Sequence, residues 1–449
     1  MKVSNWIGIL GCLMALAFLI NPHVARAQDY NSQGCAWPLE FSPEGSGNVQ
    51  GPDGAARYWI MPFDTAEYES MTIKGTYPNI RFFSFTAYET IACNPPESMC
   101  QDGFNLVEYH LYDAQITPDP GGINPFVPPG GRNGTYSVVI SRTGPSSGNT
   151  IAVAKDKLVW VVMRMYVADA DQSQSGQSLM GGVPLPTITL TDLAGASKQL
   201  DACSPINKWM DISKLAQFLF PPDKDLSIAE GTPSSDRLWF ASPKNPPSIL
   251  WPNPDGKYLM MWPGDNYQPG RIIVIHGKAP GFPGTFNGSP IWEPSRGFRT
   301  VDMRYWALCE QNFVPPLSLV ACATDLTTRL EGGYYTIVIS DDRQRPNWLR
   351  PDINWLPYGD EQYPKFVVIR NMVPAPDFPY AIQNVWAAPP DHYCTFDLSF
   401  QDLPTRDDLD KKGPCAKELM GDYYPDAVWC DKSTFSHGGW QACMGKQRH

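Results

Sequence analysis

Gly134-Thr135-Tyr136-Ser137-Val138-Val139-Ile140-Ser141 returns 199 positions later as Gly333-Tyr334-Tyr335-Thr336-Ile337-Val338-Ile339-Ser340. Each segment alternates aromatic and β-branched residues after a glycine, which is typical of a β-strand that begins at a turn. Chance similarity between strands explains a single match of this kind. It explains poorly a series of matches in the same order, so further matches would indicate two copies of one domain.

Further matches do occur in the same order, with an offset that stays between 199 and 206. They pair Pro52-Asp53-Gly54 with Pro254-Asp255-Gly256, Ile73-Lys74-Gly75-Thr76-Tyr77-Pro78 with Ile275-His276-Gly277-Lys278-Ala279-Pro280, and Val161-Val162-Met163-Arg164 with Val367-Val368-Ile369-Arg370. The sequence therefore predicts an internal duplication.

The composition and the residue pattern indicate a mainly all-β protein. The 37 glycines and 45 prolines make turns dense and long helices improbable. Leu158 to Val167 is almost continuously apolar, as expected for a strand buried on both faces. We expect two tandem β-sandwich or jelly-roll-like domains. A short linker helix is expected near Asp211 to Phe220, where the apolar residues fall on one face and Pro221 ends it.

The N-terminus has the features of a secretory signal peptide. Lys2 gives a basic start, Ile7 to Ile20 is an apolar run too short to span a bilayer comfortably, and Ala25-Arg26-Ala27 is a cleavage site. An uncleaved anchor is the alternative. We expect a signal peptide at 1–27, domain one at 28–204, a helical linker at 205–233, domain two at 234–390 and a disulfide-rich C-terminal extension at 391–449.

Export makes the cysteines candidates for disulfides. Ten remain after the signal peptide, an even number, and they form no C-x-x-C pairs that would favour zinc. They are Cys35, Cys93, Cys100, Cys203, Cys309, Cys322, Cys394, Cys415, Cys430 and Cys443. We expect local disulfides between Cys93 and Cys100 and between Cys309 and Cys322. The pairing of the other six stays open.

The charge balance excludes some partners. The formal net charge is −11, and loss of Lys2 and Arg26 with the signal peptide makes the mature chain still more acidic. A nucleic-acid partner is therefore not expected, since phosphate binding needs a basic surface. No apolar run after the signal peptide is long enough to cross a bilayer, so we expect no membrane span and a secreted or periplasmic location.

The order of motifs resembles a known family. The first copy has Phe82-Phe83-Ser84-Phe85, then Tyr112-Asp113, Asn124-Pro125-Phe126 and Arg164-Met165-Tyr166; the second has the Tyr335 strand, Asn354-Trp355-Leu356-Pro357 and Val368-Ile369-Arg370. This resembles bacterial exported proteins that carry a domain of unknown function, the family numbered 1214. The resemblance implies β-rich domains and no established activity. The first copy lacks the Asn-Trp-Leu-Pro element, and the second lacks the Asn-Pro-Phe loop.

The Asn-Trp-Leu sequence occurs twice, seven residues apart, and gives the best functional hint. Asn347 and Trp348 form the first pair, and Asn354 and Trp355 the second. Flat indole faces beside amides suit sugar rings, whose C–H faces are apolar and whose hydroxyls need partners. The alternative is that both tryptophans close the end of the domain-two core.

Other motifs point to catalysis or metal binding less specifically. Gly144-Pro145-Ser146-Ser147-Gly148 fits a nucleophile elbow but precedes no helix, so a plain turn is expected. His276 with Asp302 is a candidate acid–base pair, and a sheet-end histidine is the alternative. Asp119 and Asn124 lie in a Pro/Gly loop that is a candidate calcium site, although such a loop needs no metal.

Arg164 and Arg370 interrupt apolar strands at matching points. We expect structural ion pairs inside each sandwich, with carboxylate binding as the alternative.

Together these features favour an exported, non-catalytic binding or structural protein without a cofactor. Its expected partner is a glycan or a cell-envelope polymer. The alternative is a secreted hydrolase of polysaccharide or another polymer, which would need paired carboxylates in a groove.

Overall fold

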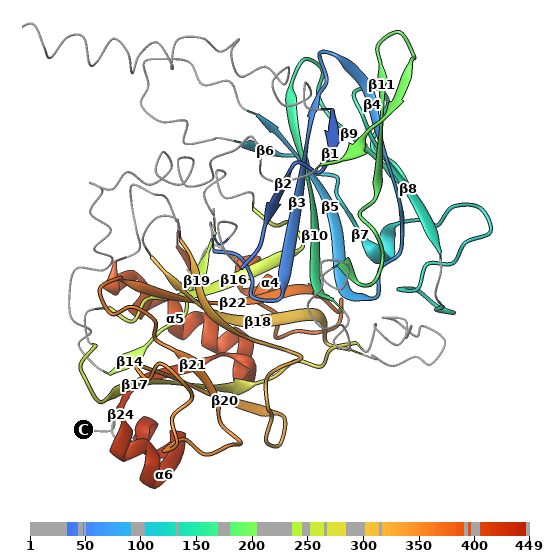
Figure 1. Ribbon diagram of the computed structural model, residues 1–449. Helices are drawn as coiled ribbons and strands as arrows, with labels where there is room; N and C mark the ends of the chain where they lie inside the picture. Colours follow the sequence, from blue (N-terminus) through green and yellow to red (C-terminus); the bar gives the residue numbers. More distant parts are fainter. Residues whose placement is uncertain are drawn as a thin grey trace, which may run out of the picture.

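The computed structural model describes residues 34–43, 48, 51–90, 104–131, 134–168, 180–203, 236–244, 252–264, 267–283, 301–313, 317–389, 394–396 and 405–445. The expected signal peptide, the linker helix near 211–220 and the Cys93–Cys100 loop lie outside these residues. The mainly β fold is confirmed. Figure 1 shows two β-rich bodies, domain one in blue to green and domain two in yellow to red.

Domain one contains two sheets. The first has the order β2-β3-β10-β5-β6, with β7 also paired to β5, and the second has the order β12-β11-β4-β8-β9. Their strands are β2 (Leu39–Phe41), β3 (Ala56–Asp64), β4 (Tyr68–Thr76), β5 (Ile80–Thr90), β6 (Phe104–Leu106), β7 (Leu111–Tyr112), β8 (Thr135–Ser141), β9 (Thr150–Ala152), β10 (Leu158–Ala168), β11 (Thr187–Asp192) and β12 (Ser197–Gln199).

Domain two contains a sheet of order β16-β22-β18-β19 and a sheet of order β14-β24-β17-β20-β21. Their strands are β14 (Arg237–Leu238), β16 (Gly256–Met261), β17 (Arg271–Lys278), β18 (Met303–Asn312), β19 (Leu319–Thr324), β20 (Tyr334–Ser340), β21 (Asn354–Pro357), β22 (Lys365–Pro374) and β24 (Asp426–Asp431). Two short parallel pairs join β1 (Cys35–Ala36) to β13 (Asp201–Ala202) and β15 (Ser242–Pro243) to β23 (Thr395–Phe396). The helices are α4 (Ile382–Trp386), α5 (Arg406–Met420) and α6 (Lys432–Gly445).

The two domains pair their strands in the same register. Tyr58 lies opposite Arg164 in domain one, as Tyr258 lies opposite Arg370 in domain two. β8 and β20 each continue to a parallel neighbour, so that Ile140 faces Ile151 and Ile339 faces Leu356. The sequence matches therefore mark structurally equivalent strands.

A glycine at the same position of each domain makes the same close contact with a tyrosine. Gly75 lies opposite Tyr136, and Gly277 lies opposite Tyr335. A Cβ atom at Gly75 would come within 2.7 Å of the Tyr136 hydroxyl oxygen, and one at Gly277 within 2.8 Å of that of Tyr335. Each glycine is therefore needed to seat a buried tyrosine on its neighbouring strand.

The expectation that the Leu158–Val167 strand is covered on both faces is confirmed, because every residue from Val159 to Val167 is buried. Alternate residues such as Val161 and Met163 belong to the sandwich core. Val162 and Tyr166 on the other face pack in smaller clusters, and that of Tyr166 includes Tyr305 of domain two. The outer face of this sheet is thus an interface between the domains, and Figure 1 shows the ends of β3, β10 and β5 meeting β16, β22 and β18.

The C-terminal segment supplies an interior strand. β24 lies between β14 and β17 and pairs with β17 over six residues. It takes the place that β11 takes beside β4, since Ala427 faces Ile275 as Ile188 faces Ile73. Part of the segment expected as an extension therefore completes the domain-two sandwich.

Four disulfides join described cysteines. The expected bond between Cys309 and Cys322 is confirmed, and the two residues lie directly opposite each other on β18 and β19. The other bonds are Cys35–Cys203, Cys394–Cys415 and Cys430–Cys443. The last two lie in the C-terminal region, where they fix α5 and α6 to domain two.

Two buried ion pairs cross the domain interface reciprocally. Arg81 of domain one lies 3.2 Å from Asp325 of domain two, with both side chains fully buried. Arg304 of domain two binds both carboxylate oxygens of Asp113 of domain one, at 2.6 and 2.8 Å. The register places Arg81 and Arg304 at equivalent positions, since Ser84 and Ala307 face the matched arginines of β10 and β22. The domains therefore associate like the two halves of a symmetric dimer.

Among the residues that the structure describes, no helix is both long and apolar enough to cross a membrane.

Replacing Asp113 by asparagine should lower the free energy of unfolding by about 3–5 kcal/mol, because Arg304 would be left buried without its counter-ion. Urea denaturation followed by circular dichroism measures this loss. Asp352→Asn is the control, since Arg350 and Asp352 form an ion pair in solvent and contribute little. Equal stability of Asp113→Asn and Asp352→Asn would contradict the role given to the interface pair.

Candidate functional site

The two tryptophans singled out from the sequence lie on the same face of domain two. Trp348 and Trp355 are half-buried and pack on the outer side of the sheet that contains β20 and β21. Their cluster includes Val338 of β20 and Phe435 of α6. The indole nitrogen of Trp355 donates to the Ser340 hydroxyl at 2.9 Å. Both tryptophans therefore pack against the cluster that includes α6, and both residues remain partly exposed.

A third tryptophan joins this group. Trp440 of α6 is half-buried in the same cluster, and its ring stacks on His276 at 3.7 Å between centroids. His276 in turn stacks on Tyr334 at 5.5 Å. We call Trp348, Trp355 and Trp440 the tryptophan face. The sequence did not single out Trp440 as a ligand contact, because it lies 85 positions beyond Trp355.

The two asparagines have different surroundings. Asn347 is exposed beside Trp348. Asn354 is buried, and its amide donates to the carbonyl oxygens of Arg329 at 2.9 Å and Thr336 at 3.1 Å. Its oxygen accepts from the Arg329 backbone N–H at 2.8 Å. Asn347 is therefore accessible to a ligand. The side-chain amide of Asn354 is already used in hydrogen bonds to the backbone of Arg329 and Thr336.

Within the described part of the chain, no contact joins Ser146, His276 and Asp302 to one another. The Ser146 hydroxyl accepts a hydrogen bond from the Ala152 backbone N–H at 2.9 Å in a turn of domain one. His276 lies in domain two with its Nδ1 3.0 Å from the Thr336 hydroxyl, and burial lowers the pKa of its ring. Asp302 accepts from the Gly281 backbone N–H at 2.7 Å. These partners fit the turn and sheet-end interpretations.

The candidate calcium loop is held together by its own hydrogen bonds. The Asn124 amide donates to the carbonyl oxygens of Asp113 and Ile116, and its oxygen accepts from the Phe126 backbone N–H. Asp119 accepts from the Thr135 hydroxyl at 2.8 Å. Buried Asn124 therefore stabilises the loop through hydrogen bonds to its backbone. These bonds are consistent with the alternative given above, that such a loop needs no metal.

An acidic cleft of about 580 Å³ lies at one end of domain two, lined by Asp341, Asp342, Asp360 and Glu361 among others. The Tyr267 hydroxyl lies 3.0 Å from Asp341 and 2.8 Å from Glu361, which brings the two carboxylates within about 6 Å of each other. Burial acts to raise the pKa of the Asp341 carboxyl, but hydrogen bonds from Lys432 and Tyr267 outweigh it and lower the pKa. Asp341 is thus held ionised.

The expectation of ion pairs inside each sandwich is wrong for Arg370. Its Nη1 lies 2.9 Å from Asp53 of the other domain, because the outer faces of both sheets are buried against each other. Arg164 donates to the hydroxyl groups of Thr86 and Tyr88, the latter at 2.6 Å. The matched arginines Arg164 and Arg370 therefore both lie at the interface between the domains.

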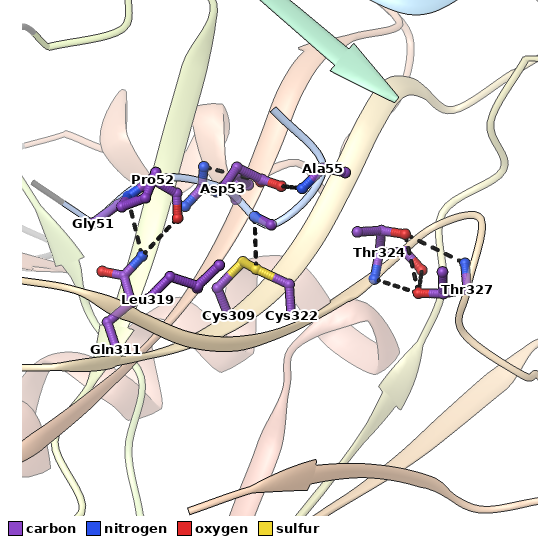
Figure 2. The surroundings of a disulfide bond; sticks show 12 residues. Gly51, Pro52, Asp53, Ala55, Cys309, Gln311, Leu319, Cys322, Thr324 and Thr327 are labelled. Carbon is purple, nitrogen blue, oxygen red and sulfur yellow. Dashed lines mark hydrogen bonds and ion pairs between the residues drawn. A yellow bond between two sulfur atoms is a disulfide. The ribbon is translucent and has the colours of Figure 1, made fainter. Parts of the chain in front are cut away.

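Asp53 belongs to a loop of domain one that docks on a disulfide of domain two. The Gly54 backbone N–H donates to the sulfur of Cys322 at 3.1 Å, and Gln311 donates to the carbonyl oxygen of Gly51 at 3.0 Å. Figure 2 shows Gly51 beside Gln311 and Asp53 beside the disulfide. The Asp53 carboxylate also accepts from the Tyr305 hydroxyl at 2.7 Å. Asp53, Cys309 and Cys322 are the one group of potential metal ligands found among the described residues, but both sulfurs are used in the disulfide.

The equivalent aspartate of domain two meets a histidine. Nε2 of His110 lies 3.0 Å from the buried Asp255 carboxylate, and its Nδ1 lies 3.2 Å from the Glu108 carbonyl oxygen. Burial acts to lower the pKa of His110, but the hydrogen bond and the charge of Asp255 outweigh it and raise the pKa. The protonated ring can donate on both sides.

Sequence reasoning found the Pro52-Asp53-Gly54 match without a role for its aspartate. It also missed Arg81 and Arg304, although Arg81-Phe82-Phe83 and Arg304-Tyr305-Trp306 share an arginine before two aromatic residues. That repeat was the available signal. Their partners lie 244 and 191 positions away in the other domain, and no local pattern indicates them.

Comparisons with known proteins add little. No family model matches the chain, and no curated protein matches it. A solved structure of an uncharacterized protein from Burkholderia cenocepacia is similar, with a TM-score of 0.46 and 13% identity over 78% of this chain and 82% of that chain. The VPA0106 protein from Vibrio parahaemolyticus has a TM-score of 0.37 and 13% identity over 79% of this chain and 90% of its own. The resemblance to the family numbered 1214 stays a prediction.

The His110–Asp255 contact predicts a pH-dependent interface. A histidine whose pKa is raised by folding stabilises fully below its unfolded value of about 6.5, and this stabilisation is lost as the pH rises through the folded-state pKa. His110→Gln should therefore lower the free energy of unfolding by about 1–2 kcal/mol at pH 5.5 and by less at pH 8.5. Denaturation at both pH values measures the difference. The exposed His437 offers the control variant His437→Gln, and a pH-independent loss in His110→Gln would refute the assignment.

Proposed function

We propose that this chain is an exported, non-catalytic binding protein that recognises a carbohydrate or cell-envelope polymer through the tryptophan face. The supporting observation is that Trp348, Trp355 and Trp440 cluster around α6 on one side of domain two and that each residue is only partly buried. Open aromatic surface suits the apolar face of a sugar ring. Asn347 is an exposed polar neighbour that can serve a hydroxyl group.

The disulfides support export. Four disulfide bonds among the described cysteines are expected of a protein that folds in an oxidising environment. We assign the location as periplasmic or extracellular, after removal of the signal peptide.

The shared register of the two domains supports the origin of the chain by duplication. The two glycine–tyrosine contacts and the two tyrosine–arginine pairs occupy corresponding positions. Val167 and Val373, three residues beyond the matched arginines, both have a positive φ, of 52° and 43°. A β-branched residue rarely adopts this conformation, so two unrelated domains would hardly share it.

A hydrolase acting on polysaccharide is the second candidate, and one observation favours it. Asp341 and Glu361 share the Tyr267 hydroxyl in a cleft, with the two bonded carboxylate oxygens no more than about 6 Å apart, a range that includes the spacing of a retaining pair. Because Asp341 is held ionised, it would be the nucleophile and Glu361 would have to be the acid. Glu361→Gln would then abolish hydrolysis of a polymer that the protein cleaves.

Removing two indoles of the tryptophan face should weaken polymer binding. In a pull-down with insoluble cell-wall polysaccharide, Trp348→Ala with Trp355→Ala should bind about thirtyfold less tightly than the wild type, since each lost stacking contact costs around 1 kcal/mol. Trp386→Ala is the matched control, because Trp386 is exposed on α4 and belongs to no part of this face.

The binding proposal fails if the wild-type protein retains no polysaccharide, or if the Trp386 variant loses as much binding as the double variant. Circular dichroism of the double variant separates lost contact from lost packing of α6.

A further inference from the structure

We propose that a cavity between the two domains binds a small organic carboxylate of about the size of one six-membered ring. This site is distinct from the tryptophan face, and its test is independent of polymer binding.

The cavity has a volume of about 150 Å³ and is built from equivalent residues of both domains. Ile60 and Val162 face each other in domain one, as Met260 and Val368 do in domain two. Phe41 and Phe366 add aromatic surface. An apolar cavity of about 150 Å³ in another protein holds benzene, so one ring is the fitting size here.

Among the described residues that line the cavity, the charged side chains are Arg164 and Arg370. Both are almost fully buried, with 3% and 4% of their surface exposed. The Asp53 carboxylate binds Nη1 of Arg370 and is not itself part of the lining. Nε of Arg370 has no hydrogen-bond partner within the described part of the chain. A buried guanidinium with an unused N–H is a strong donor to an anion.

The two guanidinium groups approach the same phenols. Burial raises the pKa of Tyr258 to about 12, and the positive charges of Arg370 and Arg164 both act against this rise. Tyr166, whose hydroxyl lies 3.2 Å from that of Tyr58, is likewise within reach of both charges. The polar wall therefore offers phenol and guanidinium donors from both domains to one acceptor group.

This combination selects the ligand class. A carboxylate can accept from the guanidinium and phenol groups, and an attached ring can fill the apolar part. Inorganic phosphate would leave the apolar walls uncovered, and a neutral ring would leave Nε of Arg370 without an acceptor.

The test uses the purified mature protein and three probes in isothermal titration calorimetry. Benzoate should bind, and should bind at least about tenfold more tightly than benzamide, its neutral analogue, or acetate, which has the charge without the ring. Its binding should also raise the thermal midpoint with increasing concentration. Absence of benzoate binding overturns the proposal, and equal affinity for benzamide overturns the role of the arginines.

A variant that fills the cavity locates the site. Met260→Trp should abolish benzoate binding, whereas Leu193→Trp should not, because Leu193 is 55% exposed in a turn of domain one. If Met260→Trp does not fold, Val368→Leu narrows the same space by less and should weaken benzoate several-fold.

Unchanged affinity in a folded cavity-filling variant would overturn the assignment to this cavity. Benzoate binding by the protein lacking Trp348 and Trp355 should stay as in the wild type, so failure of the polymer proposal and failure of this one are distinguishable.

Discussion

Two fully buried arginine–aspartate pairs hold the domains together, and each takes its cation from one domain and its anion from the other. Charges removed from water are tolerable only when paired and hydrogen-bonded. Either domain alone would expose an arginine and an aspartate whose ion-pair partners belong to the other domain. It would also expose the apolar outer face of its sheet. The cavity and the docking of the Gly51–Ala55 loop all depend on this contact, as Figure 2 illustrates for the loop.

Much of the architecture could be predicted because its signals are local. Each of these signals depends on which faces of a single strand are buried. They are the alternation in Gly134–Ser141, the similar alternation in Gly333–Ser340 and the continuous apolar run of β10. The Cys309–Cys322 bond was accessible for the same reason, since only 13 positions separate the cysteines. The sequence matches did not extend to β11 and β24. In domain two, α4 and α5 lie between β22 and β24, whereas in domain one β11 is the next described strand after β10.

Less of the candidate site could be predicted from the sequence. Trp348 and Trp355 pack against one cluster, but the burial of Asn354 accompanies hydrogen bonds to Arg329 and Thr336 that no sequence motif predicts. Arg164 and Arg370 were recognised as unusual, yet their surroundings come from the opposing domain. The pairing of Asp53 with Arg370 joins the two domains, and the pattern of residues along one strand carries no information about a surface that covers it.

The position of β24 has a consequence for the order in which the molecule is assembled. This strand lies in the middle of its sheet, yet it is delivered after every other strand of the sheet. As the chain emerges, the earlier strands of domain two must wait with one edge of the sheet unpaired, and such an edge invites association with other chains. Domain one has its full set of strands much sooner and presents the complementary charged surface, so it is placed to act as a template on which domain two completes its folding.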